Sequence, residues 1–234
     1  MKNREQLVIA ALILGVMVMG CSMLKQDGPA APNSNTASAN TTTANTAVTD
    51  GPTSLFTPGS NAKDDLEKIA DRFMALSSFR STMKGTGKNP FNSVVDFIAP
   101  DKFQIRSDLP NGKSMEMRII GKDTYMNANG NWQKVPIDVG SQIPNFRETF
   151  TRDEINRFKE IEYAGEDQVD GTPAYLYKYS GAAMKGGSAY TSKTWVSKTS
   201  GLPLKIIANY ETGDLKTMEI AYDYTTKITI EAPK

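Results

Sequence analysis

Residues 115–119 read Met-Glu-Met-Arg-Ile, and this stretch decides the fold class. Apolar and charged residues alternate in it, so the two methionines and Ile119 share one face of an extended chain, and Glu116 and Arg118 share the other. Successive side chains of a β-strand point to opposite faces of its sheet. The stretch therefore predicts a half-buried strand over residues 114–120.

Similar strands are predicted on both sides of it, separated by short turns rich in Gly, Pro, Asn and Asp. The expected strands are 79–86, 91–98, 102–107, 114–120, 123–128, 131–135, 159–164, 173–180, 188–197, 203–211 and 215–232. Connections this short favour antiparallel pairing between neighbours. The last segment is long, and we expect it to bend near Thr225 and Thr226.

Two helical segments interrupt the strand pattern. The first begins after Asn61, a suitable N-cap, and fades at Ser77-Ser78, with Asp64 and Asp65 close to the positive end of the helix dipole. Its apolar residues recur at helical spacing and are Leu66, Ile69, Ala70, Phe73 and Leu76. The second lies within residues 141–159, where the capping-box signature at 151–154 predicts one or two short helices.

This order of elements favours an α+β domain over residues 62–234. One large curved antiparallel sheet of about 11 strands, with helices on its concave side, accommodates it. Two smaller sheet domains in tandem are the alternative, but no linker-like stretch divides this range.

Residues 26–61 have the composition of a flexible spacer, rich in Ser, Thr, Asn, Ala, Gly and Pro. Such a segment buries too little apolar surface to offset the entropy lost on ordering. We therefore expect the segment before the domain, residues 21–61, to contain a disordered tether, whose reach is about 30–35 Å.

The N-terminus has the organisation of a lipoprotein signal peptide. Lys2 and Arg4 precede an uncharged apolar run, residues 7–19, which is shorter than the roughly 20 residues that span a bilayer. The run ends in Val-Met-Gly-Cys at 18–21, which resembles the bacterial lipobox. The resemblance implies that residues 1–20 are removed by cleavage between Gly20 and Cys21, with diacylglycerol on the Cys21 sulfur.

Lipidation at Cys21 predicts an extracytoplasmic protein anchored to a membrane. Each buried CH₂ of a lipid chain contributes about 0.8 kcal/mol, so two or three chains anchor stably. Ser22, rather than Asp, follows the cysteine, and in lipoproteins of double-membrane cells this favours the outer membrane. An uncleaved anchor helix with a buried Cys21 is the alternative.

Composition excludes several classes of function. The chain has no histidine, one cysteine, and 27 Lys+Arg against 26 Asp+Glu. Histidine-based triads, CxxC zinc sites and intramolecular disulfides are excluded, and a net charge of +1 gives no field that attracts nucleic acid. Residues 85–88, Gly-Thr-Gly-Lys, lack the P-loop spacing. We predict no enzyme, no cofactor and no metal; a hydrolase using two carboxylates is the remaining catalytic alternative.

Several short segments of the domain resemble the LolA-like half-barrel superfamily. They are 75–80 (ALSSFR), 97–106 (FIAPDKFQIR), 120–125 (IGKDTY) with 130–132 (GNW), 193–205 (KTWVSKTSGLPLK), 222–224 (YDY) and 228–233 (ITIEAP). With the lipobox, the chain is more similar to the anchored LppX/LprG-type bacterial lipoproteins than to the soluble carriers. The resemblance implies a single strongly curved antiparallel sheet, an unclosed half-barrel of about 11 strands with helices plugging the concave side. It also implies an apolar cavity in this half-barrel that holds acyl chains, and we expect the 141–159 helices to be its plug or lid.

Aromatic and methionine side chains of the predicted strands are the candidates for lining such a cavity. They are Phe97, Phe103, Met115, Met117, Ile119, Tyr125, Trp132 and Trp195. Methionines and aromatic rings adapt to different apolar ligands. Ordinary core packing is the alternative for each of them, and the stripe formed by Tyr175, Tyr177 and Tyr179 could instead face solvent, a sheet edge or a partner protein.

Three functions remain open from the sequence. The first is a lipoprotein that binds or transfers a lipid or acyl chain. The second is a protein-binding sensor or regulator of the cell envelope. The third is a structural surface lipoprotein with a filled core.

Overall fold

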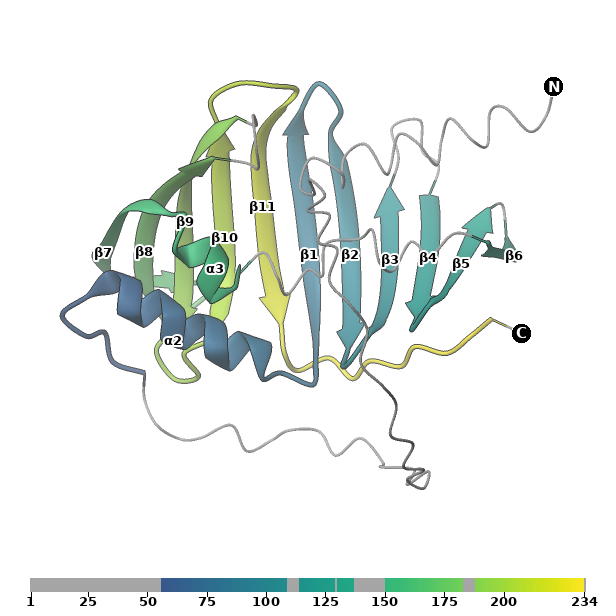
Figure 1. Cartoon of the computed structure of the whole chain (residues 1–234), viewed down its shortest axis with the longest axis horizontal. Coiled ribbons are helices and arrows are strands. Elements are labelled where there is room, and N and C mark those ends of the chain that lie inside the picture. The colour runs from purple at the N-terminus through teal and green to yellow at the C-terminus, as the bar shows by residue number, and fades with distance from the viewer. Residues whose placement is uncertain (1–55, 109–113, 129, 137–149, 183–187, 234) are drawn as a thin grey trace, which may run out of the picture.

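The computed structural model describes residues 56–108, 114–128, 130–136, 150–182 and 188–233, which form an open antiparallel sheet with two helices on one face (Figure 1). The strands are β1 (Ser78–Gly87), β2 (Phe91–Ile98), β3 (Lys102–Asp108), β4 (Ser114–Ile120), β5 (Asp123–Ala128), β6 (Asn131–Val135), β7 (Lys159–Val169), β8 (Thr172–Ala182), β9 (Ala189–Ser197), β10 (Pro203–Tyr210) and β11 (Leu215–Asp223). The helices are α2 (Ala62–Met74) and α3 (Arg152–Ile155). The predicted signal peptide, Cys21 and most of the predicted tether lie outside the described residues.

The strands follow one another in space in the order β6-β5-β4-β3-β2-β1-β11-β10-β9-β8-β7. The chain thus makes two meanders, β1–β6 and β7–β11, which we call the N-terminal half and the C-terminal half. Antiparallel pairing of β1 with β11 joins them, for example at Ser81 opposite Tyr222. β6 and β7 are the two edges of the 11-stranded sheet and do not pair with each other. The predicted fold class, one unclosed antiparallel sheet with helices, is confirmed.

Both helices lie in front of the C-terminal half in Figure 1. We call the sheet face on which α2 packs the inner face, and the opposite face the outer face. Tyr177 of β8 marks the inner face, because its side chain reaches Asp65 of α2. The buried core includes residues of this face in both halves and of both helices, among them Met117 of β4, Leu66 of α2 and Ile155 of α3.

Helix α2 begins where the sequence predicts. The Asn61 side chain caps it by accepting a hydrogen bond from the backbone N–H of Lys63 at 3.0 Å. Four of its apolar residues are buried at the predicted spacing, and they are Leu66, Ile69, Ala70 and Phe73. Burying one such large side chain contributes roughly 1.5–3 kcal/mol. Leu76 follows the end of the helix and is partly buried against the same core.

The final strand is shorter than predicted. It ends at Asp223 instead of residue 232, and residues 224–233 have no strand pairing. The Asp223 side chain accepts hydrogen bonds from the backbone N–H groups of Thr225 and Thr226, which turns the chain away from the sheet. The bend expected at these two threonines is therefore where the strand stops. Ile228 and Ile230 beyond it are nevertheless buried.

Phe56, the first residue that the structure describes, contacts the sheet although it lies within the segment assigned to the tether. Its backbone N–H donates to the Lys198 carbonyl at 2.9 Å, and its ring lies 5.5 Å from the Arg72 guanidinium. Gly201 makes room for both side chains, since a Cβ there would lie 2.8 Å from Arg72 Nη1 and 3.1 Å from the Phe56 side chain. Phe56 therefore packs on the folded domain, six residues before the predicted start of the domain at residue 62.

Candidate functional site

Three rows of side chains make up the inner face of the N-terminal half. Residues paired in register on neighbouring antiparallel strands point to the same face, so the register defines each row. The first row is Phe79, Phe97, Phe103, Ile119, Thr124 and Val135. The second row is Ser81, Val95, Ile105, Met117, Met126 and Gln133. The third row is Met83, Ser93, Ser107 and Met115. None of these residues is charged, so the rows form an apolar face with a few neutral polar groups.

An aromatic series runs along the first row and continues into α2. The ring centroids of Phe79 and Phe97 are 5.2 Å apart, and those of Phe97 and Phe103 are 5.1 Å apart. Phe73 of α2 lies 4.9 Å from Phe79. Tilted ring pairs at this spacing add roughly 0.5–1.5 kcal/mol beyond the area that they bury. The series therefore couples the helix to the strands of the N-terminal half.

Most of the polar groups in these rows are buried, and two of them pair with each other. Ser93 and Ser107 share a hydrogen bond of 2.7 Å between their hydroxyls. Thr124 differs, because its Oγ1 is buried and has no hydrogen-bond partner among the residues that the structure describes. The N-terminal half thus contains one unpaired hydroxyl in an apolar surrounding.

The register separates the eight candidate cavity residues between the two faces of the sheet. Five of them lie on the inner face and belong to the buried core, and they are Phe97, Phe103, Met115, Met117 and Ile119. Tyr125, Trp132 and Trp195 lie on the outer face, since their strand neighbours Thr124 and Thr194 occupy the inner one. Only the five inner-face residues can line one common site.

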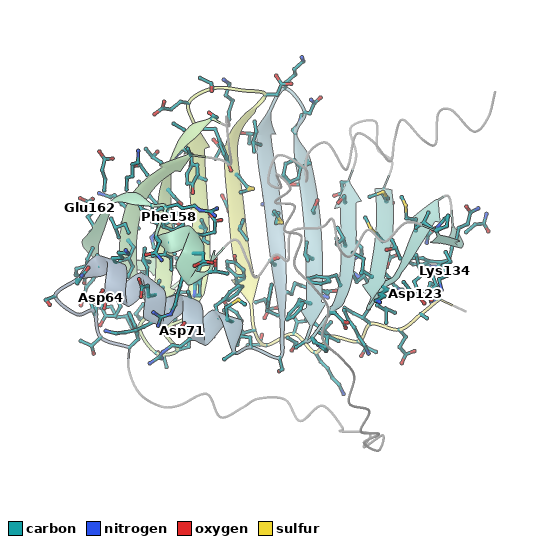
Figure 2. The ribbon with its side chains drawn as sticks, in the orientation of Figure 1. Asp64, Asp71, Asp123, Lys134, Phe158 and Glu162 are labelled. Atoms are coloured by element: carbon teal, nitrogen blue, oxygen red, sulfur yellow. The ribbon has the colours of Figure 1, made fainter. Side chains whose placement is uncertain are left out.

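The three outer-face residues contact charged side chains instead. The Arg118 guanidinium lies 4.4 Å from the centroid of the Trp132 ring and donates to the Glu231 carbonyl at 3.1 Å. Trp195 Nε1 donates to Asp167 at 2.8 Å. Near Tyr125, Asp123 and Lys134 form an ion pair of 2.8 Å at the β5–β6 edge (Figure 2). These contacts cover the outer face without forming an apolar surface.

The inner face of the C-terminal half is rich in hydroxyl groups. The tyrosine stripe of β8 faces inward, where Tyr177 donates to Asp65 at 3.2 Å and Tyr179 pairs with Thr194 at 3.0 Å. Burial and the neighbouring Asp65 carboxylate raise the pKa of Tyr177, and burial raises that of Tyr179. Both tyrosines therefore stay neutral and act as hydrogen-bonding groups beneath the helices.

Asp65 is the buried polar residue that sequence reasoning missed. The sequence suggests only a favourable charge in the first turn of α2, yet the residue is fully buried. Its two carboxylate oxygens accept from the Gly59 backbone N–H at 3.0 and 2.9 Å, and Tyr177 donates to one of them. Asp65 thus connects the segment before α2 to strand β8. The available signal was the position of Asp65, next to Leu66 and four residues before Ile69, on the apolar side of the predicted helix, where an acidic residue is unusual.

Helix α3 packs against α2 and the C-terminal half. Thr151 caps it by accepting from the Glu154 backbone N–H at 3.3 Å, which confirms the predicted capping residue. Ile155 is buried in the core, and Phe158 stacks on Tyr179 with ring centroids 4.2 Å apart (Figure 2).

Surface ion pairs join the two helices. Arg152 of α3 lies 2.7 Å from the Glu67 carboxylate and 2.6 Å from the Asp71 carboxylate of α2. The Arg152 guanidinium holds the pKa of Asp71 below its usual range. Such exposed pairs contribute only about 0–1 kcal/mol each. Residues 141–149 of the predicted plug lie outside the described residues.

Within the part of the chain that the structure describes, no helix is long and apolar enough to cross a bilayer. No cluster of three or more acidic or cysteine side chains suited to a metal ion occurs among the described residues.

The fold is an open antiparallel half-barrel with helices on its inner face, and solved structures have a similar fold. The chain is similar to the Mycobacterium tuberculosis lipoprotein LppX, with 12% identity, a TM-score of 0.57, and coverage of 73% of this chain and 98% of that chain. It is also similar to LprF from Mycobacterium bovis, with 14% identity, a TM-score of 0.56, and coverage of 75% and 98%. The resemblance to LppX-type half-barrels is thereby confirmed as a likeness of fold.

More distant likenesses carry no argument about this chain. One of them is with the Pseudomonas aeruginosa MucA/MucB complex, at 18% identity, a TM-score of 0.41, and coverage of 69% of this chain and 55% of that chain. No known family's sequence profile matches the chain. No curated protein matches it either.

Proposed function

We propose that the chain is a membrane-anchored extracytoplasmic lipoprotein that binds or transfers a hydrophobic ligand, a lipid or an acyl chain. The ligand lies on the inner face of the N-terminal half. The observation that carries this proposal is the uncharged Phe/Met/Ile surface of the three rows, on one face of a sheet whose edges do not close. The shared fold with the lipoprotein LppX supports it.

The energetics of such a surface suit an acyl chain. Each buried CH₂ contributes about 0.8 kcal/mol, so ten methylenes contribute about 8 kcal/mol, which corresponds to about micromolar affinity before ordering costs. Met115, Met117 and Met126 belong to the rows, and methionine repacks around irregular ligands because its side chain is flexible and polarizable. Met115 and Met117 are buried in the core and Met126 is partly buried against it, so a bound ligand takes the place of neighbouring side chains.

Native mass spectrometry of gently purified full chain tests the proposal directly. Co-purified lipid is expected, and the delipidated protein is expected to take up a fluorescent fatty acyl probe. A folded, delipidated chain that takes up neither lipid nor detergent would overturn the proposal. A stable protein partner in place of lipid would instead favour the envelope sensor.

Charged substitutions on the two faces locate the ligand. Met126→Asp, on the half-buried inner face of β5, is expected to abolish uptake while the protein stays folded. Met117→Asp is expected to abolish uptake and also to lower the melting temperature, because Met117 is only 5% exposed and an unpaired buried charge costs several kcal/mol. Tyr125→Asp is the matched control, because Tyr125 neighbours Met126 on β5 but lies on the outer face. A folded Met126→Asp variant with normal uptake would show that the ligand does not bind on the inner face of the N-terminal half.

The anchor is tested separately at Cys21. Cys21→Ser is expected to leave an unprocessed precursor without lipid, since the lipobox requires the cysteine. The measurements are the mass of the protein and its partition into the detergent phase. A Cys21→Ser chain that still matures and partitions with detergent would refute the anchor, and fractionation of a double-membrane host would test the outer-membrane location. The prediction that the chain is not an enzyme stays a prediction.

A further inference from the structure

Thr124 combines complete burial with a hydroxyl that has no partner. The residue is 0% exposed, and its Oγ1 has no hydrogen-bond partner among the described residues. Buried hydroxyls in folded proteins nearly always have one, because leaving such a group unpaired lowers stability. Valine has nearly the same shape and fits a β-strand at least as well. A threonine at this position therefore needs a reason beyond packing.

The surroundings of Thr124 are the apolar rows of the proposed ligand site. Ile119 of β4 and Val135 of β6 lie directly opposite it in the register. The first row continues from Ile119 to Phe103 and Phe97. The hydroxyl therefore belongs to the proposed ligand face, between Ile119 and Val135 in a row that otherwise consists of hydrocarbon side chains.

The charge of this neighbourhood limits the chemistry of what it pairs with. The inner-face positions of β3, β4 and β5 around Thr124 are Phe103, Ile105, Met117, Ile119 and Met126, and none of them is charged. An ionised carboxylate or ammonium would lose its hydration here without a countercharge. The carbonyl oxygen of an ester is also desolvated, but it is neutral, so the cost is much smaller and one hydrogen bond from a hydroxyl offsets it.

We propose that Thr124 determines specificity for neutral acyl esters, its Oγ–H donating a hydrogen bond to the ester carbonyl oxygen of the bound lipid. The inference rests on the proposed function and adds the class of ligand. It predicts that the site distinguishes an ester from a pure hydrocarbon of the same length, and that the distinction depends on one hydroxyl. Without this hydroxyl, the affinities for the ester and the hydrocarbon would differ only by the greater cost of removing the ester from water.

Two probes and three variants test this in the full, delipidated chain. The probes are a pyrene-labelled alkane and the methyl ester of a pyrene-labelled fatty acid of equal length. Thr124→Val is expected to weaken binding of the ester about tenfold, the factor given by one lost hydrogen bond, and to change binding of the alkane by less than about twofold. Thr124→Ser is expected to keep the wild-type preference. Thr82→Val, on the outer face of β1, is the matched control.

A spectroscopic readout separates a hydrogen bond from a change in packing. The infrared carbonyl band of a ¹³C-labelled ester is expected at lower frequency in the wild-type and Thr124→Ser complexes than in the Thr124→Val complex. Thr124→Val is expected to melt no lower than the wild type, because it removes an unpaired buried hydroxyl.

The outcomes distinguish the inference from the proposed function. A wild-type chain that binds both probes, with a Thr124→Val variant whose ester affinity and carbonyl band are unchanged, would overturn the inference and leave the proposed function standing. A wild-type chain that binds neither probe would overturn both.

Discussion

The two halves of the sheet carry different chemistry on the same face. In the C-terminal half, tyrosine, serine and threonine hydroxyls lie beneath α2 and α3, and they pair within the chain. Examples are Tyr177 with Asp65, Tyr179 with Thr194, and Ser192 with the Ile207 carbonyl. In the N-terminal half, the rows are hydrocarbon with few polar groups.

This difference indicates a division of roles. Hydrogen bonds in the C-terminal half are directional, so they fix the positions of the helices and of the segment before them. Apolar contacts in the N-terminal half are non-directional, so an apolar ligand can replace some of them without leaving a polar group unpaired. Among the described residues, no buried side-chain hydroxyl of the C-terminal half is unpaired, whereas the N-terminal half contains the unpaired hydroxyl of Thr124.

The largest effect is expected from a cavity in the aromatic series of the N-terminal half. Phe97→Ala removes a fully buried ring that contacts Phe79 and Phe103, and such truncations cost about 3–5 kcal/mol. Guanidinium unfolding measures this loss. Phe91→Ala, on the same strand but partly exposed, is the control and should lose less. Equal losses of stability in the two variants would show that the aromatic series stabilises this half no more than a partly exposed ring does.

Removal of Asp65 is expected to have the next largest effect, in the C-terminal half. Asp65→Ala leaves the Gly59 N–H and the Tyr177 hydroxyl without their acceptor, which we expect to cost about 3 kcal/mol. Uptake of lipid by the protein that remains folded should not change. Asp64→Ala, at the exposed neighbouring position, is the control. A loss of uptake without a loss of stability would place the ligand in this half instead.

The pairing of β1 with β11, which joins the two halves, includes a carboxylate whose contribution to stability depends on pH. Burial alone would raise the pKa of Asp223, but hydrogen bonds from Thr226 and Thr225 outweigh it and lower the pKa to about 2. Unfolded Asp titrates near 3.9, so the contribution of Asp223 is complete above about pH 4. It is lost as the pH falls toward 2, and amounts to about 2 kcal/mol.

Asp223→Asn tests this contribution. The wild type should exceed the variant in stability at pH 7, and the difference should shrink as the pH falls below 4. Urea unfolding at several pH values measures it. A constant difference between pH 7 and pH 2.5 would contradict the assignment to this carboxylate.

The smallest effect is expected from a single hydroxyl beneath the helices. Tyr179→Phe removes the partner of Thr194 and should cost about 1 kcal/mol, with no change in lipid uptake. Tyr163→Phe, at an exposed ring, is the control. Thr124→Val in the other half should behave in the opposite way, keeping stability and losing ester affinity. If both variants behaved alike, the division of roles would be wrong.

Much of the fold follows from local sequence patterns. Alternation at Met115–Ile119 and the turns between strands predict the meanders, and Asn61 and Thr151 predict the helix starts, because these signals act within a few residues. The end of β11 was missed because Ile228 and Ile230 continue the alternation of a strand. The hydrogen bonds of Asp223 that stop the strand are a local detail that alternation does not show.

The candidate site was predicted less well, since it depends on which face each residue takes. Met117 and Ile119 share a strand face by simple alternation. Tyr125 and Trp132 are aromatic in the same way as Phe97, and only the pairing between strands places them on the outer face. Thr124 gave no signal at all, because threonine is common in strands and an unpaired hydroxyl is visible only once its neighbours are known.

The pairing of β1 with β11 has a consequence for biosynthesis. These are the first and last strands of the domain, so the edge of β1 that pairs with β11 has no partner until the chain has been synthesised, and in the proposed lipoprotein also exported, as far as residue 223. At about 5–20 residues per second, this interval is on the order of 10 s. An unpaired edge strand can recruit another chain and aggregate. Nascent chains released before Leu215 are therefore expected to scatter light and to bind chaperones, and those released after Asp223 are not.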